Sequence, residues 1–163
     1  MITQEDIDAF TPMSEEECLK EFILTFKATL DVRLWYKLIK EEYAELQAET
    51  FGTVEHLKEV ADLMYVLKGF DVVTPYFLNE IVSDHELDEM DTFIEEANDL
   101  VSTAEEYYSS STVYDAFLYV HDSNMSKLDD DGNPIFREDG KIMKGPNYRA
   151  PDLSYLINRK NTK

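Results

Sequence analysis

The stretch that decides the fold is Lys37-Leu38-Ile39-Lys40-Glu41-Glu42-Tyr43-Ala44-Glu45, followed after thirteen residues by Glu59-Val60-Ala61-Asp62. Both segments have the apolar periodicity of α-helices, which turn by about 100° per residue. On a helical wheel Glu42 falls inside the apolar stripe of the first helix, and Glu45 lies at its margin. On the second helix Glu59 falls near the centre of the stripe and Asp62 at its edge. The sequence therefore predicts two consecutive helices with acidic side chains on their inward faces.

Inward-facing carboxylates need a compensating cation, because burial of an unpaired charge costs several kcal/mol or more. Glu42 and Glu45 are three residues apart, as are Glu59 and Asp62, so each pair lies on one side of its helix. Four carboxylates on adjacent antiparallel helices are an oxygen-rich ligand set that suits Mg²⁺ or Mn²⁺. The alternative is that these are solvated acids of two helices that meet. Two pairs that each intrude on an apolar stripe favour the metal site.

Length and charge narrow the class of protein. The 163 residues predict a single domain, 1–163, that is long enough to bury a core. The formal net charge of −20 argues against nucleic acid and anionic membranes as partners. No apolar run is long enough for a membrane span, and the acidic N-terminus does not look like a signal peptide. Together with the single Cys18, these features lead us to expect a cytoplasmic protein.

The rest of the chain is predicted to be mostly helical, which gives an all-α antiparallel bundle. Capping residues and apolar spacing predict helices over 14–30, 31–50, 53–73, 86–108 and 112–128, with a short last helix over 152–156. Gly52 leaves only a short connection between the second and third helices, which makes them antiparallel neighbours. A small C-terminal β-hairpin is predicted over 135–143, around Asp139-Gly140.

Two other kinds of metal site are disfavoured. Asp129, Asp131 and Glu138 match part of a calcium-loop pattern, but Lys127 stands where the first ligand should be. A di-iron carboxylate bundle needs Glu-x-x-His, whereas His56 precedes Glu59 by three residues, the reverse order.

At this point the residues resemble a known family. Glu41-Glu42-x-x-Glu45, thirteen residues and then Glu59-x-x-Asp62 is similar to the signature of the all-α nucleoside triphosphate pyrophosphohydrolases, a superfamily that includes MazG, dimeric dUTPases and phosphoribosyl-ATP pyrophosphohydrolases. A second segment resembles the C-terminal part of MazG-like proteins of phages and bacteria: His121-x-Ser123-Asn124-Met125-Ser126-Lys127, then Gly140-Lys141, then Lys144-Gly145-Pro146-Asn147-Tyr148. The matches cover about 33–70 and 113–153, and the helix within 80–111 lies outside them.

The resemblance implies hydrolysis between the α and β phosphates of a (deoxy)nucleoside triphosphate, which yields a monophosphate and pyrophosphate. It implies Mg²⁺ or Mn²⁺ on Glu42, Glu45, Glu59 and Asp62, and a role in control of dNTP pools in a bacterial or phage-infected cell. It also implies a homodimer or homotetramer. We take Glu41, at the edge of the cluster, as the candidate to orient or deprotonate the attacking water. The candidate substrate-binding residues are Asn124, Lys127, Lys144, Asn147 and Tyr148.

Several of these residues also have ordinary structural explanations. Lys127 is favoured near a helix C-terminus by the helix dipole, and the segment from Lys144 to Tyr148 contains a plain Gly-Pro turn. A second hypothesis for the whole chain is a non-catalytic acidic adaptor, or a nucleotide-sensing module that binds metal without turnover. A third is a nucleic-acid mimic that uses the −20 charge, although inward-facing acids argue against it.

Overall fold

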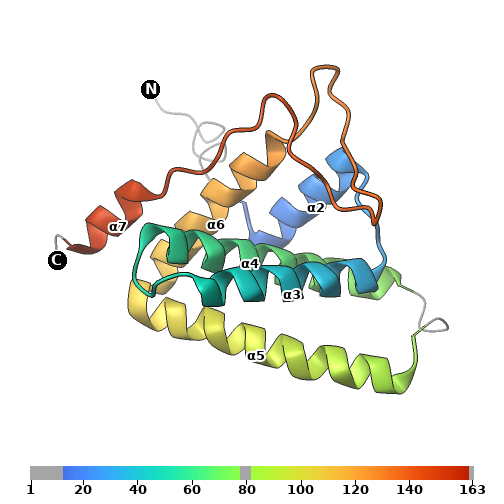
Figure 1. Ribbon diagram of the computed structural model, residues 1–163, viewed down its shortest axis with the longest axis horizontal. Coiled ribbons are helices and arrows are strands. Elements are labelled where there is room, and N and C mark those ends of the chain that lie inside the picture. The colour runs from blue at the N-terminus through green and yellow to red at the C-terminus, as the bar shows by residue number, and fades with distance from the viewer. Residues whose placement is uncertain (1–12, 78–81, 162–163) are drawn as a thin grey trace, which may run out of the picture.

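The computed structural model describes residues 13–77 and 82–161, and this part of the chain is helical without a β-strand (Figure 1). The all-α prediction is therefore confirmed for these residues. The sequence of 77–81 also favours a short helical turn, and 78–81 lie outside the described residues. The elements are α2 (Glu15–Phe26), α3 (Val32–Ala48), α4 (Val54–Val73), the 3₁₀ turn η1 (Thr74–Tyr76), α5 (Asp84–Tyr108), α6 (Ser110–Met125) and α7 (Ser154–Asn161).

Side-chain caps fix the starts of the first three described helices. Ser14 and Glu17 form a capping box, in which Ser14 N donates to Glu17 Oε2 at 2.8 Å and Glu17 N donates to Ser14 Oγ at 3.1 Å. Asp31 accepts from Arg33 N, and Thr53 accepts from His56 N. These caps satisfy amide groups that have no partner within the helix. The predicted starting points of α2, α3 and α4 are confirmed.

Other helix ends differ from the prediction. Helix α2 ends at Phe26, before the predicted Leu30, because Lys27 adopts a left-handed conformation with φ 52°. Helix α6 is capped by Ser109, whose Oγ accepts from Thr112 N at 3.3 Å, whereas the predicted helix begins at Thr112. Ser109 has φ 86°, which ends α5 and separates it from α6. Helix α6 also ends at Met125, three residues early.

Helix α4 is at the centre of the fold. It packs against α2, α3, α5 and α6, and its buried residues include Leu57, Val60 and Leu63. In Figure 1, α3 lies along α4 and α5 runs beside the pair. Gly69 allows the close approach of α3, because a Cβ atom there would lie 2.0 Å from Cζ3 of Trp35. This packing brings the acidic segments of α3 and α4 together.

The predicted C-terminal hairpin is wrong as a pair of strands. Only one antiparallel bridge forms, between Phe136 and Ile142, with Met143 N donating to Ile135 O at 2.8 Å. Arg137 N also donates to Lys141 O at 2.7 Å, but the pairing does not extend into strands, and the side chains of Asp139 and Lys141 bind α3. The segment 129–148, here called the returning loop, runs from the end of α6 back to α3 (Figure 1).

The chain closes with α7, where the sequence predicted a short last helix through Leu156. Asp152 Oδ1 accepts from Ser154 N at 3.0 Å, and Leu153 and Leu156 are buried. The predicted helix is confirmed but extends further, to Asn161. Among the helices described, none combines the length and apolar character needed to span a membrane.

Candidate functional site

Three predicted metal ligands converge where α3 packs on α4. Glu42 and Glu45 come from α3 and Glu59 from α4, and one carboxylate oxygen from each lies within 4.8 Å of the other two. Glu42 and Glu45 are neighbours on one face of α3, and the packing of α4 on α3 brings Glu59 to them. Carboxylate oxygens at this spacing are a suitable ligand set for a hard divalent cation.

Glu59 carries the clearest sign of a missing positive partner. The residue is 8% exposed, and its Oε2 atom is buried with no hydrogen-bond partner. Its other oxygen, Oε1, accepts from Lys58 Nζ at 3.0 Å. Burial raises the pKa of Glu59, and the Lys58 ammonium opposes that rise without cancelling it. An unpaired buried carboxylate oxygen within a carboxylate cluster fits a bound cation.

The environment of Glu42 also disfavours an ionised carboxylate. Burial, followed by repulsion from Asp62 and Glu45, raises the pKa of Glu42 to about 8. The protein without metal therefore holds a proton on Glu42 at neutral pH. A divalent cation would favour the ionised form and expel that proton.

Asp62 lies in the same pocket but has a cationic partner. Lys58 Nζ donates to Asp62 Oδ2 at 2.6 Å, one helical turn further along α4. Burial lowers the pKa of Lys58, but the carboxylates of Asp62 and Glu59 outweigh it and hold that pKa above its usual value. Asp62 thus lies near the cluster, but it is not one of the three residues whose carboxylate oxygens lie within 4.8 Å of one another.

The cluster opens into a pocket of about 410 Å³, whose acidic side is formed by residues of α3 and α4 and whose basic side is formed by the end of α6 and the returning loop. Glu42, Glu45 and Asp62 line the acidic side. The residues that the end of α6 and the returning loop contribute are basic and polar: Lys127, Lys141, Lys144, Asn124 and Tyr148. Apolar side chains, including Phe22, Trp35 and Val66, complete the wall. Such a pocket can hold an anion and a cation next to each other.

Most of the predicted substrate-binding residues reach this pocket. Asn124 and Lys127 come from the end of α6 and the residues just after it, while Lys144 and Tyr148 come from the returning loop. The pKa of Lys127 lies below its usual value, because burial and repulsion from Lys141 and Lys144 outweigh the attraction of Asp62 and Glu42. Lys144 Nζ lies 4.8 Å from the centre of the Tyr148 ring, a cation–π contact that helps to orient both.

Asn147 does not line the pocket. Its Nδ2 donates to Asp130 Oδ1 at 2.9 Å, a contact that ties together two parts of the returning loop. Its observed contact is therefore a structural one, within the loop.

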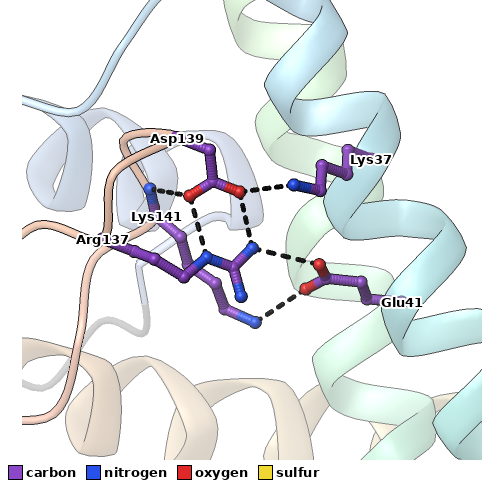
Figure 2. A network of polar contacts seen from close by, with 5 residues as sticks. All are labelled: Lys37, Glu41, Arg137, Asp139 and Lys141. Atoms are coloured by element: carbon purple, nitrogen blue, oxygen red, sulfur yellow. Dashed lines mark hydrogen bonds and ion pairs between the residues drawn. The ribbon is translucent and has the colours of Figure 1, made fainter.

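Glu41 also lies outside the pocket lining, although it precedes Glu42. Arg137 Nη2 donates to Glu41 Oε1 at 3.0 Å, and Lys141 Nζ donates to Oε2 at 2.9 Å (Figure 2). Burial raises the pKa of Glu41, but these two hydrogen bonds outweigh it and lower that pKa below its usual value. A general base needs a free oxygen near the reacting water. Both oxygens of Glu41 are paired, which is against the predicted role in activating water.

Two lysines that line the pocket, Lys58 and Lys141, are not among the site residues predicted from the sequence. Lys58 carried a local signal, because it stands four residues before Asp62 on the same helix face. Lys141 lies in the C-terminal segment that carries the family resemblance but has no predicted role, and its contact with Glu41 spans 100 residues of sequence. Only the path of the returning loop brings it to α3.

Comparison with known proteins found no matching family model, no matching curated protein and no matching solved structure.

Proposed function

We propose that the pocket binds a (deoxy)nucleoside triphosphate together with Mg²⁺ or Mn²⁺ and hydrolyses the bond between its α and β phosphates. The observation that carries the proposal is the meeting of an under-compensated carboxylate cluster with Lys127, Lys141 and Lys144 in one pocket. A polyphosphate chelated to a divalent cation has the charge pattern that matches both sides. The sequence resemblance points to the same substrate.

Glu42, Glu45, Glu59 and Asp62 would hold the cation. When bound, such an ion neutralises phosphate charge and lowers the pKa of a water toward neutrality. The lysines of the basic side would stabilise charge on the phosphate oxygens, since preorganised cations in a partly dry pocket act strongly on developing charge. Asn124 offers an amide for hydrogen bonding, and Tyr148 offers a ring and a hydroxyl for the sugar or base. We assign no base role to Glu41, because both its oxygens are paired.

Assembly into a homodimer or homotetramer is part of this proposal. Large apolar side chains lie exposed on the described surface, among them Leu24 at 79% and Tyr76 at 65%. Contacts between subunits would cover such side chains. Light scattering of the purified protein would report the mass of the particle, and a monomer at micromolar concentration would contradict this part of the proposal.

The decisive experiment is a panel of single nucleotides with ³¹P NMR detection. Each dNTP and NTP, and phosphoribosyl-ATP, would be incubated with the protein and Mg²⁺ or Mn²⁺. We expect a monophosphate and pyrophosphate from at least one of them. Formation of a diphosphate and orthophosphate would show a different bond to be cut, and the absence of any product would refute the enzymatic proposal.

A matched pair of variants tests the assignment of the ligands. Glu59→Gln keeps the shape of the side chain but removes the charge that the cation would bind. We expect it to lose more activity than the roughly 10- to 100-fold typical of an outer-shell change at a metal site. Glu95→Gln, on the exposed face of α5, is the control and should retain full activity. Retained activity in Glu59→Gln would show that the metal assignment is wrong.

The second candidate is a nucleotide-binding module without turnover. The observation that favours it is Lys58, which already occupies part of the space between Glu59 and Asp62. Such a module would be stabilised thermally by a nucleotide with metal, yet would release no monophosphate in the same NMR experiment.

A further inference from the structure

The returning loop is joined to α3 by a network of five charged side chains. Lys37 and Glu41 are one turn apart on α3, and Arg137, Asp139 and Lys141 come from the loop (Figure 2). Asp139 accepts from Lys37 Nζ at 2.7 Å and from Arg137 Nη2 at 2.6 Å. Glu41 accepts from Arg137 and Lys141 at 3.0 and 2.9 Å. The network contains three cationic and two anionic side chains, so its net charge is +1.

The members of this network are not held equally. Arg137 makes two hydrogen bonds with Asp139, through Nε at 2.8 Å and Nη2 at 2.6 Å, besides its bond with Glu41. The Lys141 ammonium has one ion-pair partner among the described residues, Glu41. Departure of Lys141 would leave Glu41 still paired with Arg137. The network can therefore release Lys141 without leaving a carboxylate unpaired.

Lys141 is also the member that reaches the pocket. It lines the pocket, whereas Lys37, Glu41, Arg137 and Asp139 do not. Its charge acts on both sides of the pocket: it opposes the rise in the pKa of Glu42 on the acidic side and adds to the fall in the pKa of Lys127 on the basic side. A flexible ammonium between a carboxylate cluster and a second lysine is well placed for an anion that bridges them.

We propose that Lys141 is a phosphate-binding residue of this pocket and that Glu41 is its positioning residue, which holds the ammonium at the rim until a polyphosphate takes it. Arg137, Asp139 and Lys37 keep the returning loop attached to α3 while Lys141 is away from Glu41. The inference rests on the proposed function for the identity of the ligand, a polyphosphate with a divalent cation. It gives Glu41 a contribution to binding in place of the water-activating role.

Calorimetric titration with inorganic tripolyphosphate and Mg²⁺ tests the proposal without needing turnover. We expect Lys141→Ala to raise the Kd about tenfold or more, as loss of a charged hydrogen bond does. Lys141→Arg should recover most of the affinity. Lys40→Ala is the control for loss of one positive charge from the same region, since Lys40 is exposed and lies over the Tyr36 ring. It should change the Kd less than twofold.

A double-mutant cycle tests the positioning role of Glu41. Glu41→Gln should weaken tripolyphosphate binding severalfold in the wild-type background and have little further effect in Lys141→Ala. Melting temperatures of all variants would show that the fold persists. Equal losses from Glu41→Gln in both backgrounds would mean that Glu41 supports the fold and not Lys141. An unchanged Kd in Lys141→Ala, or no binding of tripolyphosphate to the wild type, would overturn the proposal.

The two proposals fail in different ways. Lys141-dependent binding of tripolyphosphate without hydrolysis of any nucleotide would support the Lys141 site and refute the enzyme. Hydrolysis of a dNTP with the same KM in wild type and Lys141→Ala would support the enzyme and refute the Lys141 site.

Discussion

The ammonium of Lys58 lies 2.6 Å from Oδ2 of Asp62 and bridges to Glu59, so a side chain of the protein itself partly neutralises the carboxylate cluster. This ammonium reaches only Oε1 of Glu59, at 3.0 Å, and Oε2 of that residue is left without a hydrogen-bond partner. The cluster therefore keeps an electrostatic demand for a further cation. Lys58 and a bound metal ion would compete for the same oxygens.

Removal of Lys58 should strengthen metal binding. Two unit charges about 4 Å apart interact by about 1 to 4 kcal/mol at the effective dielectric constants of surface and near-surface sites. We therefore expect Lys58→Met to bind Mn²⁺ roughly tenfold more tightly or better in calorimetric titration. Lys68→Met, further along the same helix and outside the pocket, is the control. Weaker Mn²⁺ binding in Lys58→Met would show that Lys58 supports the ligands and does not compete with the ion.

The raised pKa of Glu42 predicts a stability that falls as pH rises. Its pKa is about 8 in the folded protein, against an ordinary value near 4.5 in the unfolded chain. Between these values the folded state holds a proton that the unfolded state has lost, so the free energy of unfolding decreases with pH. The stabilisation is complete below about pH 4.5 and gone above about pH 8. Urea unfolding at several pH values in EDTA would measure this slope.

Glu42→Gln should flatten that slope, because the amide does not titrate. Glu95→Gln on α5 should leave it unchanged. Parallel curves for wild type and Glu42→Gln would show that another group is responsible. With Mg²⁺ or Mn²⁺ at pH 7, the wild type should also release about one proton on binding, seen as a dependence of the binding heat on the buffer.

The packing of Trp35 on Gly69 predicts that a methyl group there destabilises the fold. Alanine is favoured over glycine in a helix by up to about 1 kcal/mol, so a helix without this contact would gain stability. A Cβ at Gly69 would lie 2.0 Å from Trp35, and overpacking costs typically about 1–3 kcal/mol. We expect Gly69→Ala to lower the free energy of unfolding in urea. Adding Trp35→Phe should recover part of the loss, and a stabilised Gly69→Ala would contradict the packing.

Substitution of Gly145 should affect the pocket more than the stability of the fold. A Cβ there would lie 2.6 Å from the carbonyl oxygen of Leu128, and a backbone atom cannot yield as a side chain can. Gly145→Ala should shift the loop that carries Lys144 and weaken tripolyphosphate binding severalfold. Gly132→Asn is the matched control, because Gly132 has φ 78° with open space around it and Asn tolerates that conformation. Equal binding by both variants would mean that the loop adjusts without cost.

Much of the fold was predictable because its signals are local. Ser14 with Glu17, Asp31 and Thr53 are capping residues whose hydrogen bonds reach only two or three residues along the chain. The end of α2 was missed because a left-handed Lys27 has no sequence signature of the kind that glycine gives. The hairpin was mispredicted as a pair of strands because the turn at Asp139 and Gly140 looks the same in sequence whether its arms form a full ladder or the single bridge found here.

The sequence by itself indicated Glu42, Glu45 and Glu59 as members of one carboxylate cluster, since a spacing of three on a helix sets one face and Gly52 makes the two helices neighbours, but it also placed Asp62 among them, outside the group of three that the structure brings together. Only the tertiary structure decided the partners of those charges. Whether Glu41 faces a water or two cations depends on where a loop about 100 residues away returns, and helical periodicity carries no information about that path. Local hydrogen bonding and side-chain period are written in the sequence, whereas the pairing of distant charges follows from how the helices pack.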